Sequence, residues 1–241
     1  MKRTALILAA LLCMASRHPD RMIRADLALN ASFNRGDASD RSMYNHSTSF
    51  IGNASVVSGE RFLTLDGTGD YLQVADSNFL SFTSGGQDQA WSFSGWIYLS
   101  ALTAKQYVAI KGSEFQITIG HSAAPAQKGL TVILYNAAYT AYIGRTQNSA
   151  ASIPTGQWFH IGTSYSGSEV NTGLVLYLNG SSVSSTGLSS GSYAGVSNTT
   201  ASVDFGWVGY AQDASKFDDV RIYSRALSAA EVAAIYSSGR E

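Results

Sequence analysis

The sequence predicts an all-β fold, an antiparallel two-sheet jelly-roll sandwich with one short C-terminal helix. Its composition favours strands and turns, because 45% of the 241 residues are hydrophobic, only 14% are charged and 23 are glycine. Alternating apolar runs recur at short, regular spacing, and turns with Gly, Ser, Asn or Pro separate them. A complete set of helix-start residues occurs near the C-terminus. The length suits one large β domain.

The first 16 residues resemble a secretory signal, with Lys2-Arg3, an apolar core and then small residues. The apolar run is too short to span a bilayer comfortably. The alternative is a retained apolar segment used for anchoring or assembly. Residues 17–26 form a polar connector, and residues 27–239 form the predicted domain. Cys13 is the only cysteine, so an internal disulfide is impossible.

The first half of the domain begins with an alternating strand from Leu27 to Phe33. A turn-forming stretch rich in Asn, Asp, Ser and Gly follows. Residues 61–74 read as two strands around an Asp-Gly-Thr-Gly turn. The long strand from Trp91 to Leu99 places Trp96 and Tyr98 on the face opposite its larger apolar set.

The second half continues as strands separated by turns. The expected strands are Gln106 to Lys111, Phe115 to Gly120, Leu130 to Asn136, Tyr139 to Arg145, Trp158 to Tyr165, Leu174 to Asn179 and Val203 to Tyr210. Between the last two, the Ser-, Gly- and Thr-rich residues 181–202 are expected to form exposed loops. Two sheets packed face to face would bury this many half-apolar strands.

The chain closes with a strand and a helix. In the strand from Phe217 to Tyr223, simple alternation places Asp218 on one face with Val220 and Ile222. A carboxylate there is costly unless hydrogen bonds, a cation or a metal neutralise it. In the helix, Ser228 is the candidate N-cap and Glu231 completes a capping box.

Several of these segments resemble laminin-G-like domains of the concanavalin A-like lectin/glucanase superfamily. The closing Asp-Asp-Val-Arg-Ile-Tyr and Arg-Ala-Leu-Ser, the opening loop and the Asp-Gly hairpin all match that family's pattern. The resemblance covers about residues 27–236 and implies a concanavalin A-like jelly roll whose first and last strands meet.

The same resemblance implies a structural Ca²⁺, because the opening loop and the closing strand converge on calcium in many such domains. It assigns Asp40, Asn45 and Asp218 as candidate ligands, and their oxygens suit a hard cation. The alternative is that Asp40 caps a turn, whereas Asp218 bonds to backbone amides or pairs with an arginine.

Catalysis is not expected from these residues. Glucanases of this fold supply two carboxylates from one strand, as Glu-x-Asp-x-x-Glu or a close variant. The five glutamates are Glu60, Glu114, Glu169, Glu231 and Glu241, and none has a carboxylate two residues away. The chain is therefore expected to be non-enzymatic.

The resemblance thus implies an extracellular recognition or adhesion module for a glycan or a glycosylated surface. Trp96 and Tyr98 are candidates for stacking on a sugar, although such aromatics often pack under a neighbouring segment. A net charge of −1 without a Lys/Arg block does not suit nucleic acid. The alternative function is a structural or decorating subunit of a larger assembly, such as a phage capsid, tail or fibre, at the virion surface.

Overall fold

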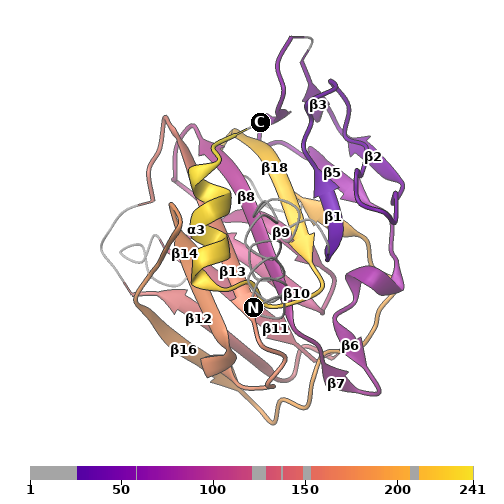
Figure 1. Cartoon of the computed structure of the whole chain (residues 1–241), viewed down its shortest axis with the longest axis vertical. Helices are drawn as coiled ribbons and strands as arrows, with labels where there is room; N and C mark the ends of the chain where they lie inside the picture. Colours follow the sequence, from indigo (N-terminus) through magenta and orange to yellow (C-terminus); the bar gives the residue numbers. More distant parts are fainter. Residues whose placement is uncertain are drawn as a thin grey trace, which may run out of the picture.

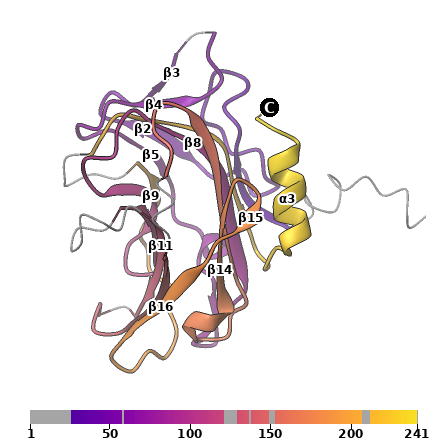
Figure 2. The ribbon, with the colours of Figure 1, turned by 90° about the vertical axis from the view of Figure 1, so that its left-hand side faces the viewer.

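The computed structural model describes residues 26–57, 59–120, 129–136, 138–148, 153–206 and 212–240. The expectations for residues 1–16, and for residues 17–25 of the connector, lie outside these ranges. Within them, two large antiparallel sheets face each other, and the helix α3 lies against the outer side of one sheet (Figures 1 and 2). The predicted all-β sandwich is confirmed.

Sheet 1, the sheet that carries α3, has the strand order β15-β14-β13-β8-β18-β4-β3, with β1 also paired to β18. Its strands are β1 (Leu27–Ala31), β3 (Ser55–Val56), β4 (Leu63–Leu65), β8 (Trp91–Leu99), β13 (Trp158–Tyr165), β14 (Leu174–Leu178), β15 (Ser181–Ser182) and β18 (Ser215–Tyr223).

Sheet 2, the opposite sheet, has the strand order β16-β12-β11-β10-β9-β17-β5-β2. Its strands are β2 (Thr48–Ile51), β5 (Tyr71–Val74), β9 (Gln106–Lys111), β10 (Phe115–Ile119), β11 (Leu130–Tyr135), β12 (Tyr142–Gln147), β16 (Ser185–Ser190) and β17 (Val203–Phe205). The smaller elements are the pair β6 (Thr83–Ser84) and β7 (Gln87–Asp88), and two 3-10 turns, η1 (Asn78–Leu80) and η2 (Asn171–Gly173).

The core lies between the sheets and is built from alternate residues of the facing strands. Phe93 and Ile97 of β8 belong to the same buried cluster as Ile117 of β10 and Val132 of β11. Each fully buried side chain of this kind contributes about 1.5–3 kcal/mol of transfer free energy. Successive residues of a strand point to opposite faces, so the remaining positions face away from the core.

The two ends of the described domain meet in sheet 1, as the sequence predicted. Leu29 of β1 pairs with Ile222 of β18, and both side chains are fully buried. The backbone amide of Ser224 donates to the carbonyl oxygen of Asp26 at 2.9 Å. The first and last strands therefore close the sandwich together.

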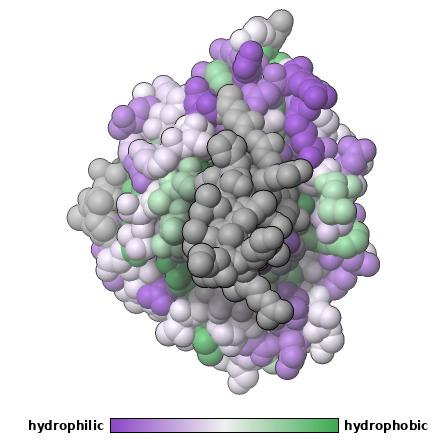
Figure 3. All heavy atoms as spheres, viewed as in Figure 1, coloured by the Kyte–Doolittle hydropathy of each residue, from purple (hydrophilic) through white to green (hydrophobic). Residues whose placement is uncertain are grey.

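The helix α3 (Ala229–Ser237) begins as predicted. The Ser228 hydroxyl accepts from the Glu231 amide, and the Glu231 carboxylate accepts from the Ser228 amide. Val232 and Ile235 are buried in a second apolar cluster with Leu227. Apolar side chains gather over α3, whereas hydrophilic ones gather around β3 (Figure 3). The described part of the chain contains no helix with the length and apolar character of a membrane span.

The Ser-, Gly- and Thr-rich residues 181–202 differ from the expected loops. They contain the edge strand β16, which pairs with β12 over six residues, from Ser185 to Ser190. Backbone hydrogen bonds hold an edge strand in place, and its side chains can face water, so small polar residues suffice.

Candidate functional site

Asp40 is a buried carboxylate whose oxygens accept hydrogen bonds from the protein itself. Oδ1 accepts from the amides of Asn30 and Ser42 at 2.9 and 2.8 Å. Oδ2 accepts from the Ser42 hydroxyl at 2.7 Å and the His46 amide at 2.9 Å, and lies 2.7 Å from His46 Nδ1. Although burial raises its pKa, these bonds outweigh burial and hold the pKa of Asp40 below its usual value. Calcium at Asp40 would have to displace some of these donors.

Asn45 is the second candidate ligand. It is exposed, and its backbone φ of 48° places it in the left-handed region. Asparagine adopts this conformation more readily than most residues, so Asn45 forms the turn between Asp40 and His46. Its position in the loop is explained by backbone geometry, and a metal contact remains a prediction.

The predicted facing of Asp218 is wrong, because β18 contains a β-bulge. Between Asp218 and the next paired residues, β18 uses one residue more than β8, and Asp219 has φ 47°. The extra residue reverses the alternation, so Phe217, Val220 and Ile222 all pack into the core. Asp218 therefore faces the outer side of sheet 1.

On that side Asp218 forms an ion pair and a backbone hydrogen bond. Its Oδ2 lies 3.4 Å from the guanidinium of Arg240, and its Oδ1 accepts from the Asp219 amide at 2.9 Å. Burial and the charge of Asp219 raise the pKa of Asp218 to about 8, against the opposing effect of Arg240. The described residues contain no group of three His, Cys, Asp or Glu side chains placed to hold a metal. A calcium shared by Asp40, Asn45 and Asp218 stays a prediction.

Trp96, the first candidate for sugar stacking, packs beneath α3. Its ring stacks on Tyr236 of the helix at 5.5 Å between centroids, and it meets His160 edge-on at 5.4 Å. Packing under a neighbouring segment is the alternative expected from the sequence for such an aromatic residue, and it gives Trp96 a role in docking the helix.

Tyr98, the second candidate, belongs to a mixed aromatic and cationic cluster on the same side of sheet 1. It contacts Trp158 edge-on at 5.9 Å, and the Lys216 ammonium lies 5.5 Å from the Tyr98 ring centroid. Lys216 also lies over Phe62, and the Arg240 guanidinium covers Trp158 at 3.9 Å. The exposed stacking surface of Tyr98 is therefore shared with charged neighbours.

A different aromatic group occurs at sheet 2. We call it the tyrosine face, and it consists of Tyr107, Tyr135, Tyr139 and Tyr142. The Tyr135 ring lies 5.1 Å from Tyr139 and 5.7 Å from Tyr142. Tyr135 and Tyr142 are opposite each other in register, whereas Leu134, next along β11, is in the core. These two side chains therefore point outward, away from the sandwich.

Burial raises the pKa of Tyr107, Tyr135 and Tyr139, so these three hydroxyls remain protonated at neutral pH. Burial is the main cause that raises the pKa of Tyr135, and the nearby Tyr107, Tyr142 and Tyr139 raise it further. Tyr139 is 53% exposed, and Tyr107, Tyr135 and Tyr142 are half-buried. The face thus combines accessible aromatic carbon with hydroxyl groups that can donate or accept hydrogen bonds.

Polar side chains cross the same outer face of sheet 2. Gln116 is opposite Ile133 in β11 and opposite Ile110 in β9, and Ile110 is opposite Asp204. Residues paired in this way share one face of a sheet. Asp204 accepts from the Gln73 amide at 3.4 Å, so an amide and a carboxylate occur together on the same outer face of sheet 2, with β9 and β10 between them and β11.

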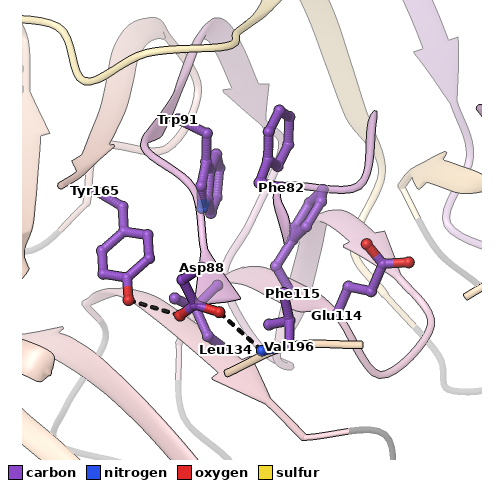
Figure 4. A pocket seen from close by; sticks show the side chains of 8 residues that line it. All are labelled: Phe82, Asp88, Trp91, Glu114, Phe115, Leu134, Tyr165 and Val196. Carbon is purple, nitrogen blue, oxygen red and sulfur yellow. Dashed lines mark hydrogen bonds between the residues drawn. The ribbon is translucent and has the colours of Figure 1, made fainter. Parts of the chain in front are cut away.

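The sandwich also encloses a small cavity, of about 10 Å³, at one end (Figure 4). It is lined by Phe82, Asp88, Trp91, Glu114, Phe115, Leu134, Tyr165 and Val196. A space of this size holds about one water molecule and cannot admit a sugar ring. The two carboxylates that line it, Asp88 and Glu114, therefore contribute to the structure of the core and do not form a sugar-binding site.

Asp88 joins three chain segments at this cavity. It accepts from the hydroxyls of Tyr165 and Tyr193, both at 2.7 Å, and from the amide of Val196 at 2.8 Å (Figure 4 draws the first and last). Burial and these bonds to Asp88 raise the pKa of both tyrosines. Asp88 thus anchors the loop that follows β16.

Sequence reasoning did not identify the tyrosine face. The strands from Leu130 and from Tyr139 were both expected, but the register that places Tyr135 opposite Tyr142 was not. Alternation in these strands, read with a short connecting turn, was the available signal.

Comparisons with known proteins agree on the fold. The family model described as the concanavalin A-like lectin/glucanases superfamily matches residues 66–233. No curated protein matches the chain. Among solved structures, the botulinum neurotoxin serotype D binding domain has a TM-score of 0.69 at 18% identity, covering 90% of this chain and 53% of that one. The binding domain of Paraclostridial Mosquitocidal Protein 1 gives 0.69 at 15%, with the same coverage.

A third structure is the serotype D ligand binding domain in complex with N-acetylneuraminic acid. It gives a TM-score of 0.68 at 17% identity, with coverage of 92% and 53%. The chain therefore spans about half the length of the solved domains that it matches. At these identities the likeness concerns the fold.

Proposed function

Since the chain belongs to the concanavalin A-like lectin/glucanases superfamily, we propose that it is a non-enzymatic module that recognises glycans outside the cell. The superfamily contains both binding modules and glucanases, so the function has to be argued from a site. No glutamate of this chain has a second carboxylate two residues away, as the glucanase motif would require. The internal cavity is also too small for a sugar.

The tyrosine face carries this proposal. Sugar rings present apolar C–H faces, which stack on aromatic side chains, and hydroxyl edges, which need polar partners. Tyr135 and Tyr142 supply adjoining aromatic surfaces on the outer side of sheet 2, and Gln116 and Asp204 supply polar groups on that side. This combination of aromatic surface and few polar groups is typical of small-ligand sites.

Support for a glycan, in general terms, also comes from the solved neighbours. The structure with N-acetylneuraminic acid shows that one domain of similar fold has been obtained with a sugar bound. The low identity carries no information about which sugar this chain would bind.

A glycan array tests the proposal, followed by titration of the best sugar. Tyr135→Ala and Tyr142→Ala are each expected to weaken binding about tenfold or more, which corresponds to about 1.4 kcal/mol. Tyr98→Ala on sheet 1 is the matched control and should leave affinity unchanged. The bound glycan should be recovered uncleaved. Equal losses in all three variants, or an array with no binding, would contradict the proposal.

A further inference from the structure

Lys111 ends β9 as a fully buried lysine whose ammonium is surrounded by oxygen atoms. Its Nζ donates to Asp76 Oδ1 and Glu114 Oε1, both at 2.8 Å. It also donates to the carbonyl oxygen of Ala201 at 2.9 Å and lies 3.4 Å from that of Thr199. Two carboxylates and two carbonyls are the ligand types that hard metal cations prefer.

The charges at this site do not balance. One ammonium faces two carboxylates, and Glu114 is only 1% exposed. Glu114 Oε1 also accepts from the Ser81 hydroxyl and from the amide and hydroxyl of Thr199. In contrast, Glu114 Oε2 is buried without a hydrogen-bond partner among the described residues. A doubly charged cation would neutralise both carboxylates, whereas the ammonium neutralises one.

The site also joins segments that are far apart in the sequence. Asp76 follows β5, Lys111 and Glu114 flank the turn between β9 and β10, and residues 199–201 precede β17. Gly112 allows this close approach, because a Cβ at that position would lie 2.7 Å from the Cβ of Ala201. A cation here holds three loops together at one end of the sandwich.

We propose that these groups form a divalent-cation site that the chain closes with its own ammonium, so that Ca²⁺ binds there once the Lys111 side chain is removed. In the native chain the lysine excludes the metal and makes this end of the fold independent of calcium. The site shares no residue with Asp40, Asn45 and Asp218. It concerns the architecture of the loops and does not rest on glycan recognition.

Calcium is the cation that the geometry favours. It accepts six to eight oxygens with flexible geometry, which the carboxylates, the carbonyls and water can supply. Water has access from one side, because the Asp76 side chain is 28% exposed. Mg²⁺ requires near-ideal octahedral geometry and gives up its own waters reluctantly, so it fits these fixed carbonyls less well.

Lys111→Ala tests this directly by isothermal titration with CaCl₂ and by thermal melting. The variant should melt below the wild type in chelator, bind one more Ca²⁺ per chain than the wild type does, and regain stability as Ca²⁺ rises. Mg²⁺ should bind about tenfold more weakly or worse. Lys111→Gln, which keeps a polar side chain, should fold without metal and also gain a calcium response, so the test remains decisive if the alanine variant fails to fold.

Two controls identify the site. Adding Asp76→Asn to Lys111→Ala should abolish the gained response, and Lys216→Ala, at a half-buried lysine on the other sheet, should show none. The proposal is overturned if neither Lys111 variant gains a calcium response, or if Mg²⁺ restores stability equally. It is also overturned if mass spectrometry finds the wild-type chain lighter than its sequence by one water. The Lys111 amine would then be joined to a neighbouring carboxyl group by an amide bond and would carry no ammonium.

Discussion

Asp88→Ala is expected to be among the most destabilising single changes in this domain, because three donors depend on its carboxylate. The donors are the hydroxyls of Tyr165 and Tyr193 and the amide of Val196, all within 2.8 Å. A hydrogen bond to a charged group contributes about 1.5–3 kcal/mol. Tyrosine hydroxyls can rotate towards other acceptors, so the lower value applies, and the three bonds amount to about 4.5 kcal/mol. The total free energy of unfolding of a native domain is only about 5–15 kcal/mol.

Equilibrium unfolding in urea, followed by circular dichroism, measures this loss. Asp88→Asn keeps one oxygen acceptor and should lose about half as much free energy of unfolding. Tyr193→Phe removes a single bond and should lose about 1.5 kcal/mol. Asp37→Ala is the control, since the Asp37 side chain is 51% exposed and pairs only on the surface, and its effect should stay within about 0.5 kcal/mol.

The order of these variants is the critical result. Asp88→Ala should lose more free energy of unfolding than Asp88→Asn, and both should lose more than Asp37→Ala. If Asp88→Ala lost no more free energy than Tyr193→Phe, the three bonds would not act through the carboxylate. The account of how the loop after β16 is anchored would then be refuted.

Three further predictions concern other parts of the domain. Ser228→Ala should lower the free energy of unfolding by about 1 kcal/mol in urea, because it removes the hydroxyl from the α3 capping box, and Ser237→Ala at the other end should have little effect. Burial, assisted by the charge of Arg221, lowers the pKa of His160 to about 4, so between pH 4 and 6.5 the unfolded chain binds more protons than the folded one. The stability present above about pH 6.5 should therefore be lost as pH falls towards 4, by on the order of 3 kcal/mol. Melting curves of His160→Gln should lack this dependence on pH. If calcium binds at Asp40, chelator should lower the melting temperature of the wild type, and an unchanged temperature would remove calcium from that loop.

The features that local sequence determines were predicted closely. The capping box of α3 depends on residues three positions apart, so Ser228 and Glu231 identified it before any tertiary contact was known. The long strand from Trp91 to Leu99 was likewise predicted with the bounds that the structure gives to β8. In both cases the spacing of residues within one short segment determines the structure.

Features that depend on pairing were not accessible in this way. The bulge at Asp218 and Asp219 reverses the facing of a strand, and nothing in its alternating pattern reveals the extra residue. Likewise, the role of Lys111 depends on Asp76 and on residues 199–201, which only the folded chain brings together. A sequence pattern predicts the strands, whereas the pairing partners decide what each side chain meets.

The pairing of β1 with β18 has a consequence for how the domain can be displayed. Residue 26 and the helix α3 both lie at sheet 1, whereas the tyrosine face lies on the outer side of sheet 2. Figure 2 shows α3 and the sheet 2 strand β11 on opposite sides of the sandwich. A tether joined at either end of the described domain would thus leave from the side opposite the tyrosines. Attached to a bead, a membrane anchor or a neighbouring protein, the domain would present its tyrosine face outward without any change of loop.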